Sequence, residues 1–240
     1  MRSFNFMLQL GLLVLAVFLF ASCDDEGVCI RGKGDIETRE INLNAFDGLR
    51  VNGSTRVFVR RGATQRVEMK GQPNVLDAIS TNVQNGIWDL SYDRCLRSHK
   101  TVEVYITVPE LSSAELIGSG RIELQDEFET NEFRTVLDGS GSLKINVAAS
   151  KVTSRLSGSG SIDLLGSATV QEMSLSGSGN IKAFSLVTDS SGVTLSGSGN
   201  IELHASTDLT VNISGSGNVY YQGNPTINSS ISGSGKLIKR

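Results

Sequence analysis

A Gly-Ser-Gly motif occurs seven times between residue 118 and the end of this 240-residue chain. Glycine-rich loops can hold phosphate groups or calcium ions. Residues 232–236 (SGSGK) come nearest to a phosphate loop, but they lack its four-residue spacing and the Ser or Thr after the lysine. Calcium-binding β-roll repeats place an aspartate two residues after a glycine, whereas each copy here has Ile, Leu or Val two residues after its second glycine. We therefore expect no metal site and no cofactor.

Acidic residues recur three positions after the second glycine, and a pair of carboxylates can cleave glycosidic bonds. Glu123, Asp163 and Glu202 hold this position in alternate copies, and Lys144 and Lys182 hold it in the copies between them. Opposite charges on neighbouring strands attract, so the column predicts a ladder of ion pairs. The chain has two histidines and no Gly-x-Ser-x-Gly motif, so no serine nucleophile is recognisable. We expect no catalytic residue and no enzymatic activity.

The spacing of the glycine pairs predicts the architecture. The first glycines of successive copies are 21, 19, 19, 20, 18 and 18 residues apart. A period near 19 is too short for helical-pair repeats and fits one coil of a β-solenoid. We expect an all-β, parallel β-helix of about seven coils. Structural roles are expected for the paired glycines: Gly118, Gly120, Gly139, Gly141, Gly158, Gly160, Gly177, Gly179, Gly197, Gly199, Gly215, Gly217, Gly233 and Gly235.

The residues around each pair alternate in a way that a flexible linker would not. In residues 193–203 (VTLSGSGNIEL), every odd position is apolar or glycine and every even position is polar. Because side chains of a strand point alternately to opposite faces, both glycines are expected to face inward along one extended path, with the serine between them outward. Glycine at such positions lets a coil narrow or bend and lets backbones approach closely.

The first half of the chain lacks the tandem glycines but also has strand patterns. Residues 49–59 look like a degenerate copy of the repeat, and Asn85-Gly86 predicts a tight hairpin. Residues 73–79 could form one short helix. We expect residues 40–110 to be a β-rich part that caps the N-terminal end of the solenoid, and residues 111–240 to be the repeat β-helix.

The first 22 residues have the form of a secretory signal peptide. Arg2 precedes an almost wholly apolar run over residues 7–21, which is too short and poorly flanked for a confident membrane span. Residues 20–23 (FASC) resemble a bacterial lipobox, so Cys23 is the expected lipidation site and membrane anchor, with an ordinary cleaved signal as the alternative. The acidic residues 24–26 begin a tether over residues 23–39, and they resemble a surface-export signal of some Gram-negative lipoproteins.

Two further cysteines remain once Cys23 is assigned to lipid. Cys29 and Cys95 are an even pair in an exported chain, which favours a disulfide; two unpaired thiols are the alternative. The formal net charge of −3 argues against a nucleic-acid surface. Tyr220 and Tyr221 are candidate binding residues, because they are adjacent and one of them must face outward.

Three segments followed by the glycine repeats carry a family resemblance. They are residues 46–51 (FDGLRV), 73–76 (PNVL) and 104–111 (VYITVPEL). Together they resemble the family described as "putative auto-transporter adhesin, head GIN domain" over roughly residues 40–225. The resemblance implies a right-handed parallel β-helix on an exported, often lipid-anchored protein, and it brings no catalytic residues.

The N-terminal signal sequence and the predicted architecture together predict a lipid-anchored protein of the outer membrane that acts as an adhesin or interaction protein at the cell surface. A periplasm-facing scaffold or sensor, and a polysaccharide-acting enzyme, are the alternatives. The expected partners are the membrane, through Cys23, and a glycan or protein ligand, while a homo-oligomer stays open.

Overall fold

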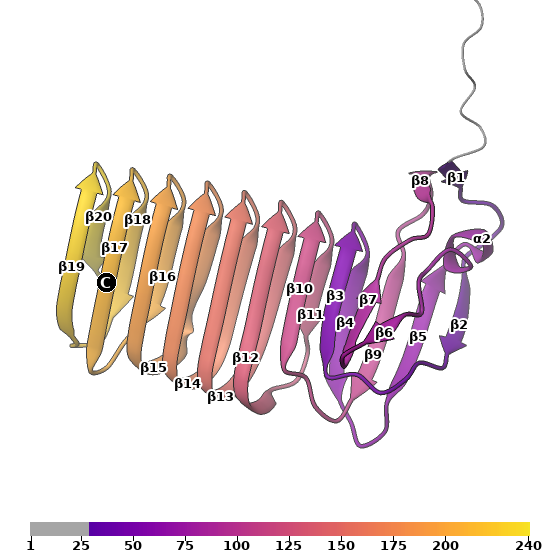
Figure 1. Ribbon diagram of the computed structural model, residues 1–240, viewed down its shortest axis with the longest axis horizontal. Helices are drawn as coiled ribbons and strands as arrows, with labels where there is room; N and C mark the ends of the chain where they lie inside the picture. Colours follow the sequence, from indigo (N-terminus) through magenta and orange to yellow (C-terminus); the bar gives the residue numbers. More distant parts are fainter. Residues whose placement is uncertain (1–28) are drawn as a thin grey trace, which may run out of the picture.

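The structure is a computed structural model that describes residues 29–240 (Figure 1). The expected signal peptide, Cys23 and the acidic residues after it lie outside the described residues. The described chain is wound into a β-solenoid of about seven turns, which confirms the all-β solenoid expected from the glycine spacing. Within residues 29–240, no helix combines the length and the apolar character needed to cross a membrane.

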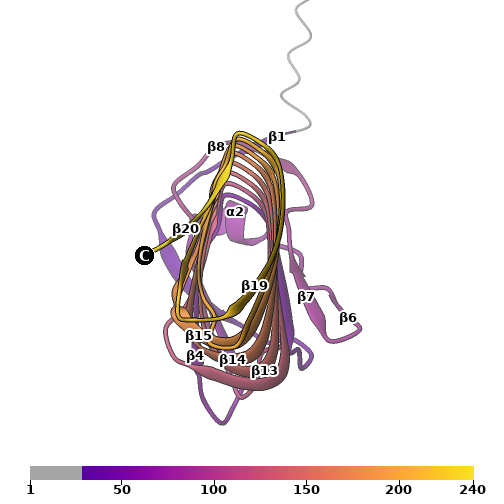
Figure 2. The same cartoon turned by 90° about the vertical axis from the view of Figure 1, so that its left-hand side faces the viewer.

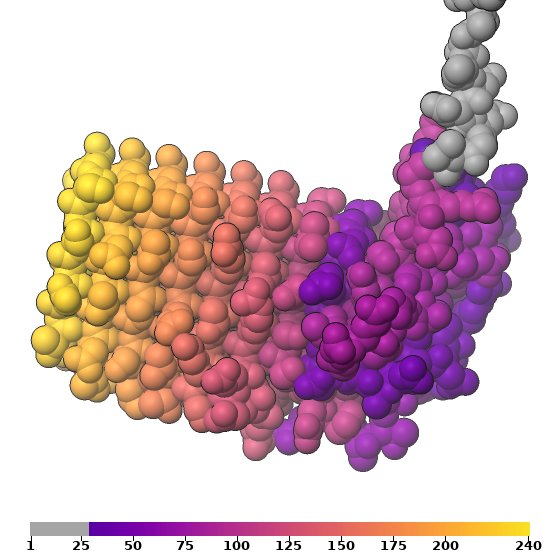
Figure 3. Space-filling model, in the orientation of Figure 1, coloured from indigo at the N-terminus to yellow at the C-terminus, as the bar shows by residue number. Residues whose placement is uncertain are grey.

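The repeat region is a flattened tube whose coils lie directly on one another, as the end-on view in Figure 2 and the space-filling view in Figure 3 show. Each coil approaches the Gly-Ser-Gly motif along one broad side of the tube and leaves it along the other. Successive coils pair through parallel ladders. The strands of this region are β10 (Ser113–Gly118), β11 (Arg121–Leu124), β12 (Phe128–Gly139), β13 (Ser142–Gly158), β14 (Ser161–Gly177), β15 (Asn180–Gly197), β16 (Asn200–His204), β17 (Asp208–Gly215), β18 (Asn218–Gln222), β19 (Thr226–Gly233) and β20 (Lys236–Lys239).

The apolar residues of the alternating pattern line the inside of this tube. Leu156 pairs in register with Leu175, and Leu175 with Leu195, and all three are fully buried. On the opposite wall, Ile162 and Ile181 stack in the same way. The period-two pattern of the sequence therefore becomes continuous aliphatic columns, and burial of these columns is the main favourable term that holds coil on coil.

The glycine pairs form the sharp corner of each coil. A strand ends at the first glycine and the next begins after the second, so the extended path expected through both glycines is interrupted there. The first glycines have φ between 117° and 152°, a region that favours glycine, and this conformation turns the chain sharply. The serine faces solvent and the second glycine is buried. The period-two pattern alone does not reveal this turn, because the glycines occupy the inward positions of the pattern whether the chain continues as a strand or turns.

Corners of successive coils are stacked by hydrogen bonds as well as by shape. The N–H groups of Ser140 and Gly141 both donate to the carbonyl oxygen of Gly118, at 3.0 and 3.1 Å. A Cβ atom on Gly139 would lie 2.3 Å from that same oxygen. Since no side chain fits so close to a carbonyl, the contact between coils requires glycine at this position.

The N-terminal part adds a first coil and a cap. β3 (Gly48–Gly53) and β4 (Arg56–Arg61) form that coil and pair in parallel with β10 and β11. β7 (Ile87–Leu90) and β9 (Glu103–Val108) extend the two ladders, and β2 (Glu37–Ile41) and β5 (Arg66–Gly71) add antiparallel strands.

Two local features of the cap were expected from the sequence. β6 (Val83–Gln84) and β7 form an antiparallel hairpin, and Asn85 and Gly86 between them have positive φ values of 51° and 76°. The helix α2 spans only Pro73–Leu76, which is shorter than the 73–79 expected, because the chain turns after Leu76 to form a bridge between Ile79 and Tyr92.

A disulfide joins Cys29 to Cys95 across the short parallel pair of β1 (Cys29–Arg31) and β8 (Cys95–Ser98). The bridge favoured by the sequence is therefore present. It closes a sequence separation of 66 residues and ties the first described residue to the cap.

Candidate binding site

A polar groove of about 680 Å³ runs along the glycine corners. It crosses several coils, so residues from β4 to β15 contribute to one continuous surface. Its walls are made of serine hydroxyls, glycine backbone and two arginine side chains, and it has little apolar surface. The lining residues are Ser54, Arg56, His99, Thr101, Ser119, Gly120, Arg121, Ser140, Gly141, Ser142, Ser159, Gly160, Ser161 and Asn180.

One column of outward side chains forms the floor of this groove and continues beyond it. These are the residues that directly follow each corner, and each pairs in register with the next. We call them the corner column: Arg56, Arg121, Ser142, Ser161, Asn180, Asn200, Asn218 and Lys236. Neighbouring strands are about 4.8 Å apart, so the column presents polar groups at that fixed interval.

The asparagines of the corner column form an amide ladder. Asn200 Nδ2 donates to Asn180 Oδ1 at 3.3 Å, and Asn218 Nδ2 donates to Asn200 Oδ1 at 3.4 Å. Each amide is thereby fixed in orientation by the coil before it. These three asparagines are thus a linked array of donors and acceptors and not independent side chains.

The two arginines at the N-terminal end of the column are neighbours in register, one on β4 and the other on β11. Arg121 Nε donates to Ser142 Oγ at 3.1 Å. Neither Arg56 nor Arg121 forms an ion pair with any residue that the structure describes. The groove therefore carries positive charge at this end, where both side chains are exposed.

A second outward column lies two residues further along the same face. It contains the expected charges: Lys144 Nζ lies 3.0 Å from Glu123, and Lys182 Nζ lies 3.8 Å from Asp163. The register places Glu202 beside Lys182. The carboxylates that could have suggested a glycosidase are thus interleaved with ammonium groups, as the sequence predicted.

An aromatic pair continues this second column toward the cap. The rings of Phe58 and Tyr105 are stacked with centroids 5.3 Å apart, and Tyr105 is 39% exposed. Desolvation raises the pKa of the Tyr105 hydroxyl, and its hydrogen bond to Glu103, at 2.9 Å, raises it further. The hydroxyl thus remains a neutral donor to Glu103 at physiological pH.

The two tyrosines proposed from the sequence point to opposite sides of their strand, as expected for adjacent residues. Tyr220 lines a hollow of about 440 Å³ on the outer face, and the Arg240 guanidinium lies 4.9 Å from its ring centre. Tyr221 packs against the hydrophobic core. Of the two, Tyr220 lines the hollow, and the arginine already covers part of its ring.

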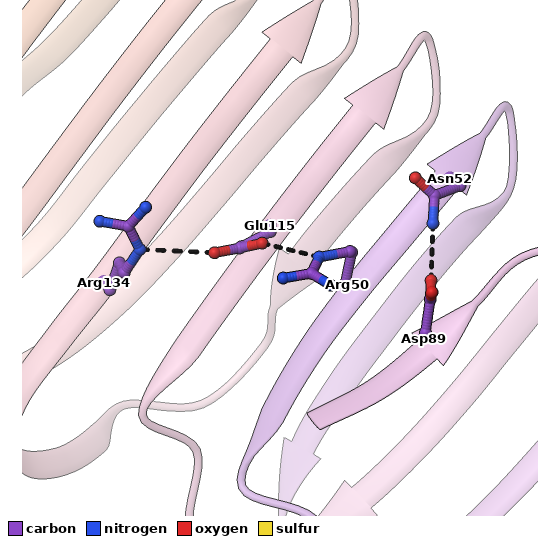
Figure 4. A network of polar contacts seen from close by, with 5 residues as sticks. All are labelled: Arg50, Asn52, Asp89, Glu115 and Arg134. Carbon is purple, nitrogen blue, oxygen red and sulfur yellow. Dashed lines mark hydrogen bonds and ion pairs between the residues drawn. The ribbon is translucent and has the colours of Figure 1, made fainter. Parts of the chain in front are cut away.

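The opposite broad face is held by ion pairs between coils (Figure 4). Glu115 lies between two arginines, 2.9 Å from Arg50 Nε and 3.4 Å from Arg134 Nε. Nearby, Asn52 Nδ2 donates to Asp89 at 2.6 Å. The charges of Arg50 and Arg134 on this face are thus paired within the protein. Among residues 29–240, no group of three metal-ligating side chains is present on either face.

The sequence matches the family described as "putative auto-transporter adhesin, head GIN domain" over residues 45–225. The chain belongs to this family. The match covers the first coil, most of the cap and all but the last of the glycine corners. No curated protein matches the chain.

Solved structures share the fold of this family member. A putative adhesin from Bacteroides fragilis aligns with a TM-score of 0.81 and 22% identity, covering 88% of this chain and 100% of that one. A putative adhesin from Parabacteroides merdae aligns with a TM-score of 0.71 and 19% identity, covering 89% and 100%. A putative lipid binding protein from Parabacteroides distasonis aligns with a TM-score of 0.74 and 24% identity, covering 88% and 99%. At these sequence identities, the similarity to the solved structures shows the fold alone.

Sequence reasoning missed the arginine pair of this adhesin-family chain. Arg121 directly follows a glycine corner, but Arg56 follows Gly53-Ser54-Thr55, in which threonine replaces the second glycine. Gly53 pairs with Gly118 in register and has φ of 107°, so it is a true corner. Aligning the degenerate copy on this single glycine would have brought the two arginines together.

Proposed function

We propose that this protein is a lipid-anchored adhesin of the bacterial cell surface, which binds a glycan or protein ligand along the groove at its glycine corners. Membership of the adhesin family and the fold of its neighbours support the adhesive role. The lipobox-like sequence at Cys23 and the acidic residues after it support the anchor and the surface position. The proposed binding site rests on one observation, the groove along the glycine corners.

The groove suits a polar and repetitive ligand. Its floor offers hydroxyl and amide groups at one interval per coil, and the coil-to-coil register fixes that interval. A polysaccharide also presents hydroxyls at a regular spacing, so several weak hydrogen bonds can form together. Because the array is already rigid, little conformational entropy is lost on binding.

The binding site is tested by filling the groove. Ser142 lies on its floor, and Ser142→Trp should abolish binding of full-length protein, purified in detergent, to the glycans that wild type retains on an array. Ser174→Trp is the matched control, since this serine is also half-buried but lies on the opposite face. Equal retention of glycans by Ser142→Trp and wild type would show that the groove is not the site.

The location is tested on intact cells. Protease added outside should remove the wild-type protein, and metabolic labelling with a fatty acid should mark the wild type but not Cys23→Ser. Labelled protein that resists the protease would indicate the periplasm-facing scaffold or sensor. Release of shortened sugars from any polysaccharide on the array would indicate the enzyme and would contradict a purely adhesive role.

A further inference from the structure

The charge of the corner groove is concentrated at one end. Arg56 and Arg121 lie there side by side, and the next residues of the corner column, from Ser142 to Asn180, are neutral. The groove is therefore divided into a cationic end near the cap and a neutral floor of hydroxyl and amide groups.

Two arginines on adjacent strands repel each other unless an anion lies between them. On the opposite face, Arg50 on β3 and Arg134 on β12 lie two strands apart, and Glu115 on β10 between them contacts both (Figure 4). Arg56 and Arg121 have no such carboxylate among the described residues. The guanidinium groups of Arg56 and Arg121 are thus left to solvent or to a ligand.

The nearest acidic residues are already engaged. Glu103 is the register neighbour of Arg56, but it accepts a hydrogen bond from the Tyr105 hydroxyl at 2.9 Å and lies 3.7 Å from Lys70 Nζ. Glu123 lies two residues beyond Arg121 on the same face and is 3.0 Å from Lys144 Nζ. Both carboxylates therefore already contact a lysine, Lys70 on the neighbouring strand β5 and Lys144 in the second column.

We propose that Arg56 and Arg121 together bind an anionic substituent of an acidic polysaccharide, a sulfate or a uronate carboxylate, while the neutral part of the corner column binds the adjoining sugars. Guanidinium groups form strong paired hydrogen bonds to such planar or tetrahedral oxyanions. This inference rests on the proposed function, and it names the ligand class of the same groove.

The distribution of charge argues for a polysaccharide and against a nucleic acid. A nucleic-acid strand carries a phosphate at every nucleotide and is bound by many cations along its path. The groove has one cationic pair followed by uncharged residues, and the whole chain has a net charge of −3. A chain of sugars with spaced acidic groups fits this arrangement better.

The test compares two double variants of the full-length protein that lose the same charge. Arg56→Gln/Arg121→Gln removes the pair in the groove, and Arg134→Gln/Arg155→Gln removes two exposed arginines from the opposite face. Binding to immobilised heparin, polygalacturonate, neutral dextran and double-stranded DNA is measured by interferometry at low and physiological salt. Unchanged melting temperatures establish that each variant is folded.

We expect the groove variant to bind heparin or polygalacturonate about tenfold or more weakly than wild type, a loss of about one charge-assisted contact. The control variant should stay within about twofold. Loss confined to heparin identifies sulfate as the anion, and loss confined to polygalacturonate identifies the carboxylate. Equal weakening in both variants, wild-type affinity for dextran equal to that for both acidic polymers, or tighter binding to DNA would overturn the proposal.

The glycan array separates this inference from the function on which it rests. If Ser142→Trp abolishes array binding while Arg56→Gln/Arg121→Gln leaves it unchanged, the groove is the binding site and the acidic-ligand assignment is wrong. If neither variant affects binding, the groove is not the site and both proposals are wrong.

Discussion

Replacing Gly177 with alanine should destabilise the solenoid through two separable causes. This glycine has φ of 127°, which alanine adopts only with strain. In addition, a Cβ atom would lie 2.3 Å from the carbonyl oxygen of Gly158 in the coil before it. The oxygen belongs to the backbone of the preceding corner, so it can move only if the stacked coils separate locally.

Three other glycines isolate these causes. Gly53 has φ of 107° but no atom within 4 Å of its added Cβ, so Gly53→Ala carries the conformational cost alone. Gly179 is not in the left-handed region, but its Cβ would lie 2.4 Å from the Gly160 oxygen, so Gly179→Ala carries the clash alone. Gly192 has neither problem, since the atom nearest to its added Cβ, Glu172 Cγ, would be 3.8 Å away.

The expected changes in the free energy of unfolding follow from these environments. Gly53→Ala should cost about 1–2 kcal/mol for the backbone conformation. Gly179→Ala should cost about 1–3 kcal/mol for overpacking. Gly177→Ala combines both and should cost about 2–5 kcal/mol. Gly192→Ala should be neutral or stabilising by up to about 1 kcal/mol, because it reduces the entropy of the unfolded chain.

Urea unfolding of the four variants checks this order. Circular dichroism follows all coils, and the fluorescence of Trp88, the one tryptophan of the chain, follows the cap, where it is fully buried on β7. Coincident midpoints would indicate that the stack unfolds as one unit, which repeat proteins do not always do. Our reasoning about the corners is refuted if Gly177→Ala is no less stable than Gly53→Ala, or if Gly179→Ala is neutral.

Two further predictions concern the cap. Cys29→Ser/Cys95→Ser should lower the free energy of unfolding by up to roughly 4 kcal/mol, because the disulfide closes a separation of 66 residues in the unfolded chain. Wild type under reductant should unfold at the same urea concentration as this variant. A midpoint that does not change on reduction would contradict the prediction. Burial raises the pKa of Tyr92 above the usual value of 10.0, while its hydrogen bond to Thr55 opposes the shift. The unfolded chain therefore loses this proton first, so stability should be constant below about pH 10 and fall above it, and Tyr92→Phe should flatten that fall relative to wild type in urea titrations between pH 9 and 11.

The repeat region was predictable from sequence to the level of individual columns. The alternation around each glycine pair identified inward residues such as Leu175 and Ile181, which are fully buried. Counting from the glycines also placed Lys144 beside Glu123, and the two form an ion pair. These predictions succeed because in-register stacking converts equal positions in the repeat into neighbours in space.

The prediction was incomplete where the structure depends on backbone conformation or on long-range strand pairing and not on the repeat period. The positive φ at Gly177 is invisible in an alternating pattern, so the corner was taken for part of a strand. The pairing of β4 with β11 joins residues about 65 positions apart, and the intervening chain carries no repeat to set the register. The arginine pair depends on that long-range contact, and the sequence reveals it only when the degenerate copy is aligned on Gly53.

The coils differ in length by up to three residues, yet their corners remain aligned. Where β15 is one residue longer than β14, the ladder shifts between Asp163 and Leu165 and is restored before the next corner. A gene could therefore duplicate or delete one whole coil without disturbing the contacts of the others. Each such event would lengthen or shorten the array of polar groups, and the corner groove with it, by one strand spacing, about 4.8 Å.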